Sequence, residues 1–270
     1  MTWAERERLN LFHNWYPNVK DCGIKQPETE YFVLPPYGEN AEVDRLYQAF
    51  YMDNGREDLE YVRNWLDKYV VPRLNKKGLN GHIFLKNAVY SGKFNANNSC
   101  NLYGLLSLAE HLVRINYDAM CCGANGETGI VVRKYIERNA RETPCIYDGL
   151  PLRPEFRVFY DFSKEKVIFT ANYWDYDYVA PHLFDATDKI IFEHEKDRIE
   201  KAFNKNRQHV EKLVSDAMKN VKGMQDQWSI DILLDEKGVF WLIDMAVAQR
   251  SSYWEFRPDK EEYPDEHNYF

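Results

Sequence analysis

The chain has 270 residues, of which 44% are hydrophobic and 29% are charged, the balance of a soluble globular protein with a substantial core. Its 35 basic and 43 acidic residues give a net charge of -8, which argues against general nucleic-acid binding. The apolar runs are far shorter than the roughly 18 residues of a membrane span, and the charged start "MTWAERERLNLF" lacks the apolar core of a signal peptide. We therefore expect a cytoplasmic protein without a membrane segment.

The cysteines and histidines show no metal-binding spacing. Five cysteines are scattered along the chain without a C-x-x-C pair, and the seven histidines form no H-E-x-x-H pattern. An odd number of unpatterned cysteines is typical of reduced thiols in the cytosol. We expect no structural zinc site.

The first half of the chain predicts two helices and two strands after a mixed N-terminal segment. The apolar stripe of "DLEYVRNWLDKYVVPRL" (58–74) predicts a helix with Asp58 as a candidate N-cap. The segment "GHIFLKN" (81–87) is typical of a short buried strand, and "LYGLLSLAEHLVRI" (102–115) of a helix. The β-branched residues of "GIVVRKYIE" (129–137) predict the second strand.

The second half predicts two antiparallel hairpins separated by a long helix. The segment "PEFRVFYDFSKEKVIFTANYW" (154–174) forms two strands around a turn, and apolar residues at three-to-four spacing predict a helix within 186–221. The segment "WSIDILLDEKGVFWLIDMAVA" (228–248) is a hairpin around "DEKG", and the acidic tail 257–270 is expected to be loosely held. Mixed elements with late antiparallel hairpins indicate an α+β fold rather than a parallel doubly wound sheet.

The last hairpin carries two carboxylates within apolar strands. If "DEKG" is a four-residue loop, Asp231 lies opposite Leu242, and Asp244 is its diagonal neighbour on the same face, with Cα atoms roughly 7–8 Å apart. Two carboxylates at this spacing can hold magnesium. The alternative is a pair of solvent-facing strand carboxylates, although the apolar neighbours on that face argue against full solvation.

Three cations could neutralise phosphates bound to such a metal. Lys86 ends a predicted strand, Lys93 follows seven residues later across a turn, and Arg157 alternates with an apolar pair in "EFRVF". The tripeptide "SGK" ending at Lys93 is not a P-loop, because Phe94 stands where a magnesium-binding Ser or Thr is required. Each cation taken alone is better explained as a surface residue; their joint occurrence with the acids favours a nucleotide site.

The order of these motifs resembles the ATP-grasp superfamily over roughly residues 58–250. The carrying features are the Lys86-x6-Lys93 spacing, then "VVRKYIE", then "PEFRVFY", then the two-Asp hairpin. More narrowly, the chain is similar to the divergent clade that includes the eukaryotic chaperone assembling translation initiation factor two. The resemblance implies an α+β fold of two subdomains with ATP between antiparallel sheets. It divides the chain into an N-terminal region 1–80, subdomains 81–140 and 141–256, and the tail 257–270.

The resemblance also implies residue roles. Phosphate contacts would come from Lys86, Lys93 and Arg157, and magnesium would be held by Asp231 and Asp244. Four consecutive residues would line the adenine and present backbone groups to it, namely Arg133, Lys134, Tyr135 and Ile136.

One position departs from the family pattern. The hairpin usually ends with an Asn that is a further metal ligand, and Ala246 stands there, so the number of metal ions and the turnover are in doubt unless Gln249 or water substitutes.

Two functions follow from the resemblance. The first is an ATP- and magnesium-dependent ligase that activates a carboxylate as an acyl phosphate and joins it to an amine, on a small molecule, protein or peptide. Lys93, Arg157 and Arg250 are its candidate catalytic residues. Arg250, in "QRSSYWEF" (249–256), could grip a carboxylate, or the segment could be a polar connecting loop. The second function is an ATP-binding assembly chaperone that acts as a clamp on a protein partner with little or no turnover. A nucleic-acid-end ligase is disfavoured by the acidic balance.

One further segment is unusual in composition. The aromatic and acidic "ANYWDYDYV" (171–179) could face a peptide or a basic partner. Simple packing of Tyr173 and Trp174 explains the segment equally well.

Overall fold

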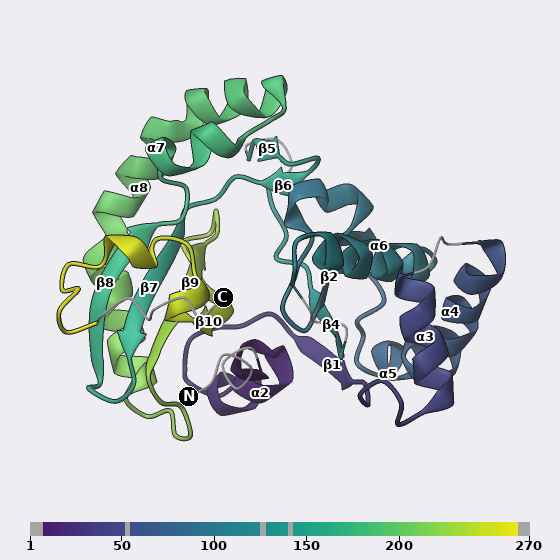
Figure 1. The fold of residues 1–270 in the computed structure, drawn as a ribbon. Helices are drawn as coiled ribbons and strands as arrows, with labels where there is room; N and C mark the ends of the chain where they lie inside the picture. Colours follow the sequence, from purple (N-terminus) through teal and green to yellow (C-terminus); the bar gives the residue numbers. More distant parts are fainter. Residues whose placement is uncertain (1–7, 52–54, 125–127, 140–142, 264–270) are drawn as a thin grey trace.

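The computed structural model describes residues 8–51, 55–124, 128–139 and 143–263. Two four-stranded antiparallel sheets form the two halves of the molecule, with helices on their outer sides (Figure 1). This arrangement confirms the expected α+β class. In the part of the chain that is described, no helix is both long and apolar enough to cross a membrane.

The first sheet carries the N-terminal helices. Its strands, in spatial order, are β1 (Thr29–Val33), β4 (Gly129–Lys134), β2 (His82–Asn87) and β3 (Asn101–Tyr103). The helices on it are α3 (Ala41–Tyr51), α4 (Arg56–Tyr69), α5 (Val71–Lys76) and α6 (Leu108–Cys121). Their apolar faces and the inner face of the sheet form one buried cluster, because each helix has an apolar stripe that must be covered.

The second sheet contains both predicted hairpins. Its strands, in spatial order, are β10 (Phe240–Val247), β9 (Gln227–Leu234), β7 (Glu155–Asp161) and β8 (Lys166–Asn172). The 33-residue helix α8 (Ala186–Met218) runs along its outer side, and the side chain of Asp185 caps the start of that helix. In Figure 1, β10 faces the first sheet and β8 lies on the far side.

Several further elements of the described chain are short. They are α7 (Tyr176–Val179), the strand pair β5 (Cys145–Ile146) and β6 (Leu150–Pro151), and the 3-10 turns η1 (Lys93–Asn98), η2 (Ala180–His182), η3 (Ala248–Arg250) and η4 (Trp254–Phe256). Of these, only the pair β5 and β6 lies between the last strand of the first sheet and the first strand of the second.

The segment before β1 ties the two halves together. Helix α2 (Phe12–Val19) buries Phe12 and Trp15 in the core of the second sheet, although the chain then continues into β1 of the first sheet. The backbone N–H of Leu242 in β10 also donates to the carbonyl of Lys25, at 2.9 Å. Residues of the N-terminal region therefore belong to the core of both sheets.

Three local predictions are corrected by the structure. The helix α4 begins at Arg56 with Gly55 at its N-cap, so Asp58 lies inside the first turn and is not the cap. The segment 102–115 is helical only from Leu108, because its start belongs to β3. The tail is held as far as residue 263, since Tyr263 is 4% exposed and packs against Trp254; the remainder lies outside the described residues.

We expect the helix before β1 to contribute to the stability of the second half. Trp15→Ala removes a side chain that is 1% exposed and should lower the free energy of unfolding by about 3–5 kcal/mol in urea denaturation. Phe184→Ala, at a side chain that is 94% exposed, is the control and should change it by less than about 0.5 kcal/mol. Equal effects of the two substitutions would contradict this packing.

Candidate functional site

The two hairpin carboxylates lie directly opposite each other. Asp244 pairs with Asp231 across the β9–β10 ladder, whereas Leu242 pairs with Ile232. The predicted register, with Asp231 opposite Leu242, is therefore wrong. The predicted four-residue loop is also wrong, since Leu234 pairs with Phe240 and five residues lie between them; a β-bulge between Leu242 and Asp244 then leaves Ile243 as an extra residue, and each change shifts the register by one. Directly paired residues have Cα atoms about 4.5–5.5 Å apart, closer than the diagonal spacing that was expected.

Each carboxylate is paired with one of the predicted phosphate cations. Lys86 Nζ, on β2 of the first sheet, donates to Asp244 Oδ2 at 2.7 Å and so links the two halves of the molecule. Arg157 holds Asp231 with two bonds, from Nε at 2.8 Å and from Nη2 at 2.7 Å. Burial alone lowers the pKa of Arg157, but the Asp231 carboxylate outweighs it and holds that pKa above its ordinary value.

The second predicted lysine reaches the same region from the turn after β2. Lys93 Nζ donates to the hydroxyl of Tyr173 and lies 3.9 Å from the centroid of its ring. The guanidinium of Arg157 lies over the same ring at 4.7 Å. Burial acts to lower the pKa of Lys93, yet Tyr173 and the nearby Glu155 carboxylate together raise it. Tyr173 thus contacts two of the three cations that were predicted to bind phosphate.

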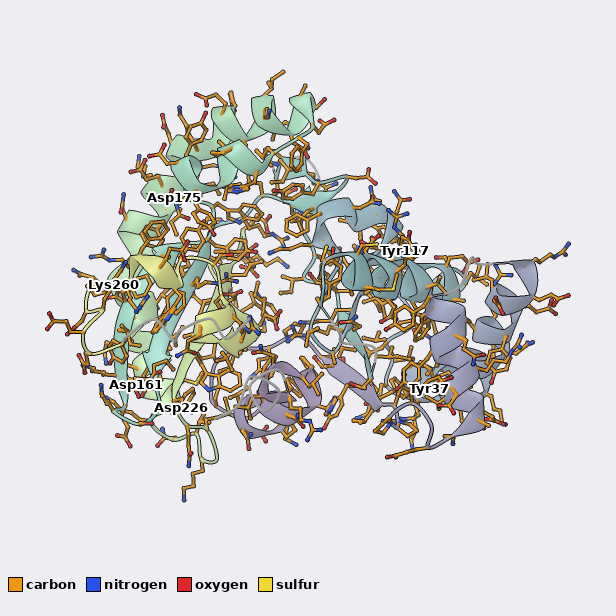
Figure 2. All side chains as sticks on the ribbon, viewed as in Figure 1. Tyr37, Tyr117, Asp161, Asp175, Asp226 and Lys260 are labelled. Carbon is orange, nitrogen blue, oxygen red and sulfur yellow. The ribbon has the colours of Figure 1, made fainter. Side chains whose placement is uncertain are left out.

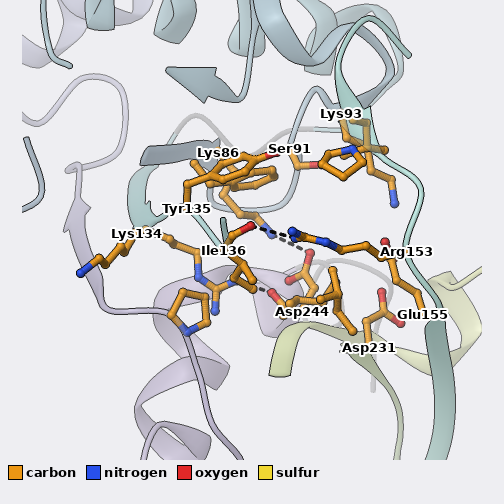
Figure 3. Close-up of a pocket in the computed structure, with 17 residues that line it drawn as sticks. Lys86, Ser91, Lys93, Lys134, Tyr135, Ile136, Arg153, Glu155, Asp231 and Asp244 are labelled. Atoms are coloured by element: carbon orange, nitrogen blue, oxygen red, sulfur yellow. Dashed lines mark hydrogen bonds and ion pairs between the residues drawn. The ribbon is translucent and has the colours of Figure 1, made fainter. Parts of the chain in front are cut away.

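A cavity of about 130 Å³ lies between the sheets and collects most of the predicted residues (Figure 3). Its walls come from both halves of the molecule, and the predicted residues that line it are Lys86, Lys93, Arg133, Lys134, Tyr135, Ile136, Asp231 and Asp244. Arg157 reaches the site through its ion pair with Asp231.

The segment predicted to line the adenine forms one end of this cavity. The Arg133 guanidinium donates to the carbonyl of Ile243, the bulge residue, and to Thr29 Oγ1 at 3.2 Å. Arg133 is 3% exposed, and its Nη2 has no hydrogen-bond partner among the described residues. Tyr135 stacks on the ring of His82 at 3.8 Å.

Two charged residues that line the cavity were missed in the sequence. Arg153 is 4% exposed and donates to the carbonyls of Ile136 at 2.8 Å and Glu137 at 2.7 Å, and to Glu236 Oε1 at 2.9 Å. It fixes the backbone of the predicted adenine segment against the β9–β10 turn. No motif marked this arginine, because its partners are carbonyls and a distant turn residue.

Glu155 is the second missed residue. Burial raises its pKa to about 6, an effect that Lys93 partly offsets and Asp231 reinforces. The strand period could have identified it, since Glu155 lies two residues before Arg157 and therefore on the same face of β7.

Arg250 lies on a neighbouring cavity. This second cavity, of about 280 Å³, shares Lys86 and Asp244 with the first and is otherwise lined by residues such as Asn10, Val89 and Arg250. The Lys86–Asp244 ion pair therefore borders both cavities, and Arg250 is on the far side of it from the adenine segment.

The solved structure of Cdc123 from Schizosaccharomyces pombe is similar over the whole chain, with a TM-score of 0.56 and 14% identity, covering 100% of this chain and 96% of that one. The chain has the ATP-grasp fold. The predicted resemblance and fold class are thereby confirmed.

Lower scores are found with two further ATP-grasp proteins. The biotin carboxylase domain of 2-oxoglutarate carboxylase from Hydrogenobacter thermophilus has a TM-score of 0.44 and 12% identity, covering 91% of this chain and 41% of that one. The RimK domain ATP-grasp protein from Sphaerobacter thermophilus has a TM-score of 0.36 and 9% identity, covering 89% and 59%. No family model and no curated protein sequence matches the chain.

The raised pKa of Glu155 predicts a pH-dependent contribution to stability. The folded protein keeps a proton on Glu155 that the unfolded chain releases above the ordinary pKa of 4.5. This contribution to the free energy of unfolding is present below pH 4.5 and is lost as the pH rises through about 6. Glu155→Gln should remove this difference between pH 4.5 and 6 in urea denaturation curves.

The control is Glu60→Gln, at an exposed position of α4. It should keep the pH dependence of the unmodified protein. Parallel curves for unmodified protein and Glu155→Gln across this range would contradict the assignment.

Proposed function

We propose that the cavity between the sheets binds ATP with magnesium and that the protein is an ATP-grasp carboxylate–amine ligase. The proposal rests on one observation: Asp231 and Asp244 lie opposite each other on strands β9 and β10, next to the bulge, and each carboxylate forms an ion pair with a cation. Magnesium prefers carboxylate oxygens together with phosphates and water, and phosphates prefer lysine and bidentate arginine. The four groups thus have the chemistry to exchange partners when a metal–triphosphate enters.

The residues present fit these ligands in charge and in hydrogen bonding. Arg133 Nη2 is a buried donor without a partner in the described chain, and such a group is satisfied when an acceptor atom of a ligand reaches it. Leu233 and Ile243 give the cavity an apolar wall opposite Tyr135 and Ile136, as a purine ring requires.

The cavity must open to admit the nucleotide. Its volume of about 130 Å³ is below the roughly 300–1,000 Å³ of ordinary ligand sites. The Lys86–Asp244 ion pair joins the two sheets, so the sheets cannot move apart at this point without breaking it. Opening of the cavity therefore also frees Lys86 and Asp244 to bind a ligand. We therefore expect opening and nucleotide entry to be coupled.

The chemistry of such a ligase is mainly positioning and neutralisation of charge. The nucleotide supplies a phosphoryl group: an acceptor carboxylate oxygen attacks the terminal phosphorus, ADP leaves, and an amine then displaces phosphate from the acyl carbon. In this chain Lys86, Lys93 and Arg157 would neutralise the phosphate oxygens, with Asp231 and Asp244 orienting the metal. Arg250 would orient the acceptor carboxylate in the second cavity, across the Lys86–Asp244 pair.

A specific observation favours a second function, an ATP-binding assembly clamp. Ala246 pairs with Ser229 at the end of the hairpin, where the family pattern has a metal-binding Asn. Loss of a metal ligand reduces the stabilisation of phosphoryl transfer more than it reduces nucleotide binding, since only the former needs the full coordination set. The sequence resemblance to the chaperone clade implies the same alternative. In either case we propose residues 81–140 and 141–256 as the two subdomains of the nucleotide site.

Substitutions of the ion pair that links the sheets test nucleotide binding. Lys86→Ala and Asp244→Ala should each raise the dissociation constant of magnesium-ATP by about tenfold or more in calorimetric titration, because each removes a phosphate or metal contact. The control Lys205→Ala, at an exposed position of α8, should leave it unchanged. The ATP assignment would fail if both folded variants bound ATP as the unmodified protein does.

Arg250→Ala distinguishes the ligase from the clamp. The protein is incubated with ATP, magnesium and a mixture of amino acids, and ADP release is measured. A ligase should release ADP only when an acceptor is added, and Arg250→Ala should raise the acceptor concentration needed for half-maximal rate without weakening ATP binding. Arg207→Ala, also exposed, is the control. Nucleotide binding without turnover, together with a stoichiometric protein complex, would support the clamp instead.

A further inference from the structure

A groove of about 800 Å³ lies along strand β8 of the second sheet, and none of the residues that line it also lines the nucleotide cavity. Its floor is the consecutive stretch 169–172 of strand β8, and its walls are the loop and helix α7 after that strand, the stretch 196–204 of α8, and the rings of Tyr253 and Phe256. This volume is within the range of ordinary ligand and peptide sites. Neither of the proposed functions uses this groove.

The floor of the groove is an unpaired sheet edge. Strand β8 is the last in the spatial order of its sheet, and its ladder partners all come from β7. An edge strand presents backbone N–H and C=O groups that an extended peptide can pair with, as happens when a peptide adds a strand to a sheet. Four consecutive residues, 169–172, line the groove, so the edge itself is accessible there.

The walls of the groove are strongly acidic. Asp175, Asp177, Asp197 and Glu200 line it, against the single cation Lys196. The side chain of Asp175 lies beside α7 and α8 in Figure 2 and caps α7 by accepting from the N–H of Tyr178 at 3.0 Å.

The one cation of the groove is already engaged. Lys196 Nζ donates to Glu193 Oε1 at 2.5 Å and lies 4.4 Å from the ring centroid of Tyr176. Asp177, Asp197 and Glu200 are exposed. The groove therefore attracts positive charge and repels phosphate-bearing ligands, including nucleic acids.

Three aromatic rings form one end of the groove. Tyr178 lies 4.1 Å from Tyr253 and 6.0 Å from Phe256 between ring centroids. Phe256 is 62% exposed. A lysine or arginine side chain on such rings gains cation–π attraction and burial of its apolar stem, in addition to its attraction to the carboxylates.

We propose that this groove binds an extended, lysine- or arginine-rich peptide segment of a protein partner, which adds a strand to the free edge of β8. Backbone pairing supplies a sequence-independent part of the affinity, and the acidic walls with the aromatic end select cationic side chains. The segment between β8 and α8 joins this groove to the nucleotide cavity, because Tyr173 contacts Lys93 while Trp174, the next residue, lines the groove. A peptide bound here is held next to the wall of the cavity.

The test uses a fluorescein-labelled octapeptide that alternates lysine and valine, and its binding is followed by fluorescence anisotropy without nucleotide. The unmodified protein should bind it, and the affinity should fall with salt. The double variant Asp197→Lys/Glu200→Lys should bind at least about tenfold more weakly. The matched control Glu57→Lys/Glu60→Lys makes the same charge change at the same spacing on exposed positions of α4 and should bind within about twofold of the unmodified protein.

Three results would overturn the proposal. They are no binding of the lysine–valine peptide, equal weakening by the two double variants, and unchanged binding of the same peptide with its alternate amides N-methylated. The second result would show attraction to net charge alone, and the third would show that the edge of β8 is not paired. Because nucleotide is absent, none of these outcomes depends on the ATP site.

Discussion

Two ion pairs, Lys86 with Asp244 and Arg157 with Asp231, determine what the space between the two sheets can hold. Both involve largely buried cations, and a buried charge is tolerated only when it is paired. Removing one member of an ion pair therefore leaves the other charge uncompensated. Replacing that member by a ligand group of the same charge does not, because the remaining side chain keeps an oppositely charged partner. A metal–phosphate group carries both positive and negative charge. Its metal cation can bind the carboxylates of Asp231 and Asp244, and its phosphate oxygens can accept hydrogen bonds from Lys86 and Arg157. The Lys86–Asp244 pair also links the two halves of the molecule, since Lys86 reaches across from the first sheet.

Much of this site could be predicted from the sequence, because strand alternation is a strong signal. The alternation in "EFRVF" places Arg157 away from the apolar core, and the structure finds it there, bound to Asp231. The bulge at Ile243 could not be predicted, because a single extra residue does not change the composition of the strand. It nevertheless moves the side chains of the strand residues after it to the opposite face of the sheet. It brings Asp244 opposite Asp231. Arg153 was missed for a related reason, as its partners are backbone carbonyls that only the fold brings near.

The segment after β8 connects the nucleotide cavity with the peptide groove. Tyr173 touches the cations Lys93 and Arg157, whereas the next five residues, 174–178, all line the groove. The sequence left open whether this aromatic, acidic stretch packs or faces a basic partner. Trp174 is 2% exposed, as the packing alternative expects, whereas Asp175 and Asp177 are exposed in the groove that we propose binds a basic peptide. A peptide bound there would therefore lie near Lys93 and Arg157, the cations that we propose contact the nucleotide, which suits either a ligase acting on a peptide or a clamp that responds to one.

The most direct test of the central claim is a crystal structure with a non-hydrolysable ATP analogue and manganese in place of magnesium. We expect an anomalous peak at coordination distance, about 2 Å, from both Asp231 and Asp244, with Lys86 and Arg157 turned to the phosphate oxygens. We also expect the base to lie between the 133–136 segment and Leu233. A nucleotide bound elsewhere, or one bound with both ion pairs intact and no metal on either carboxylate, would contradict the proposed site.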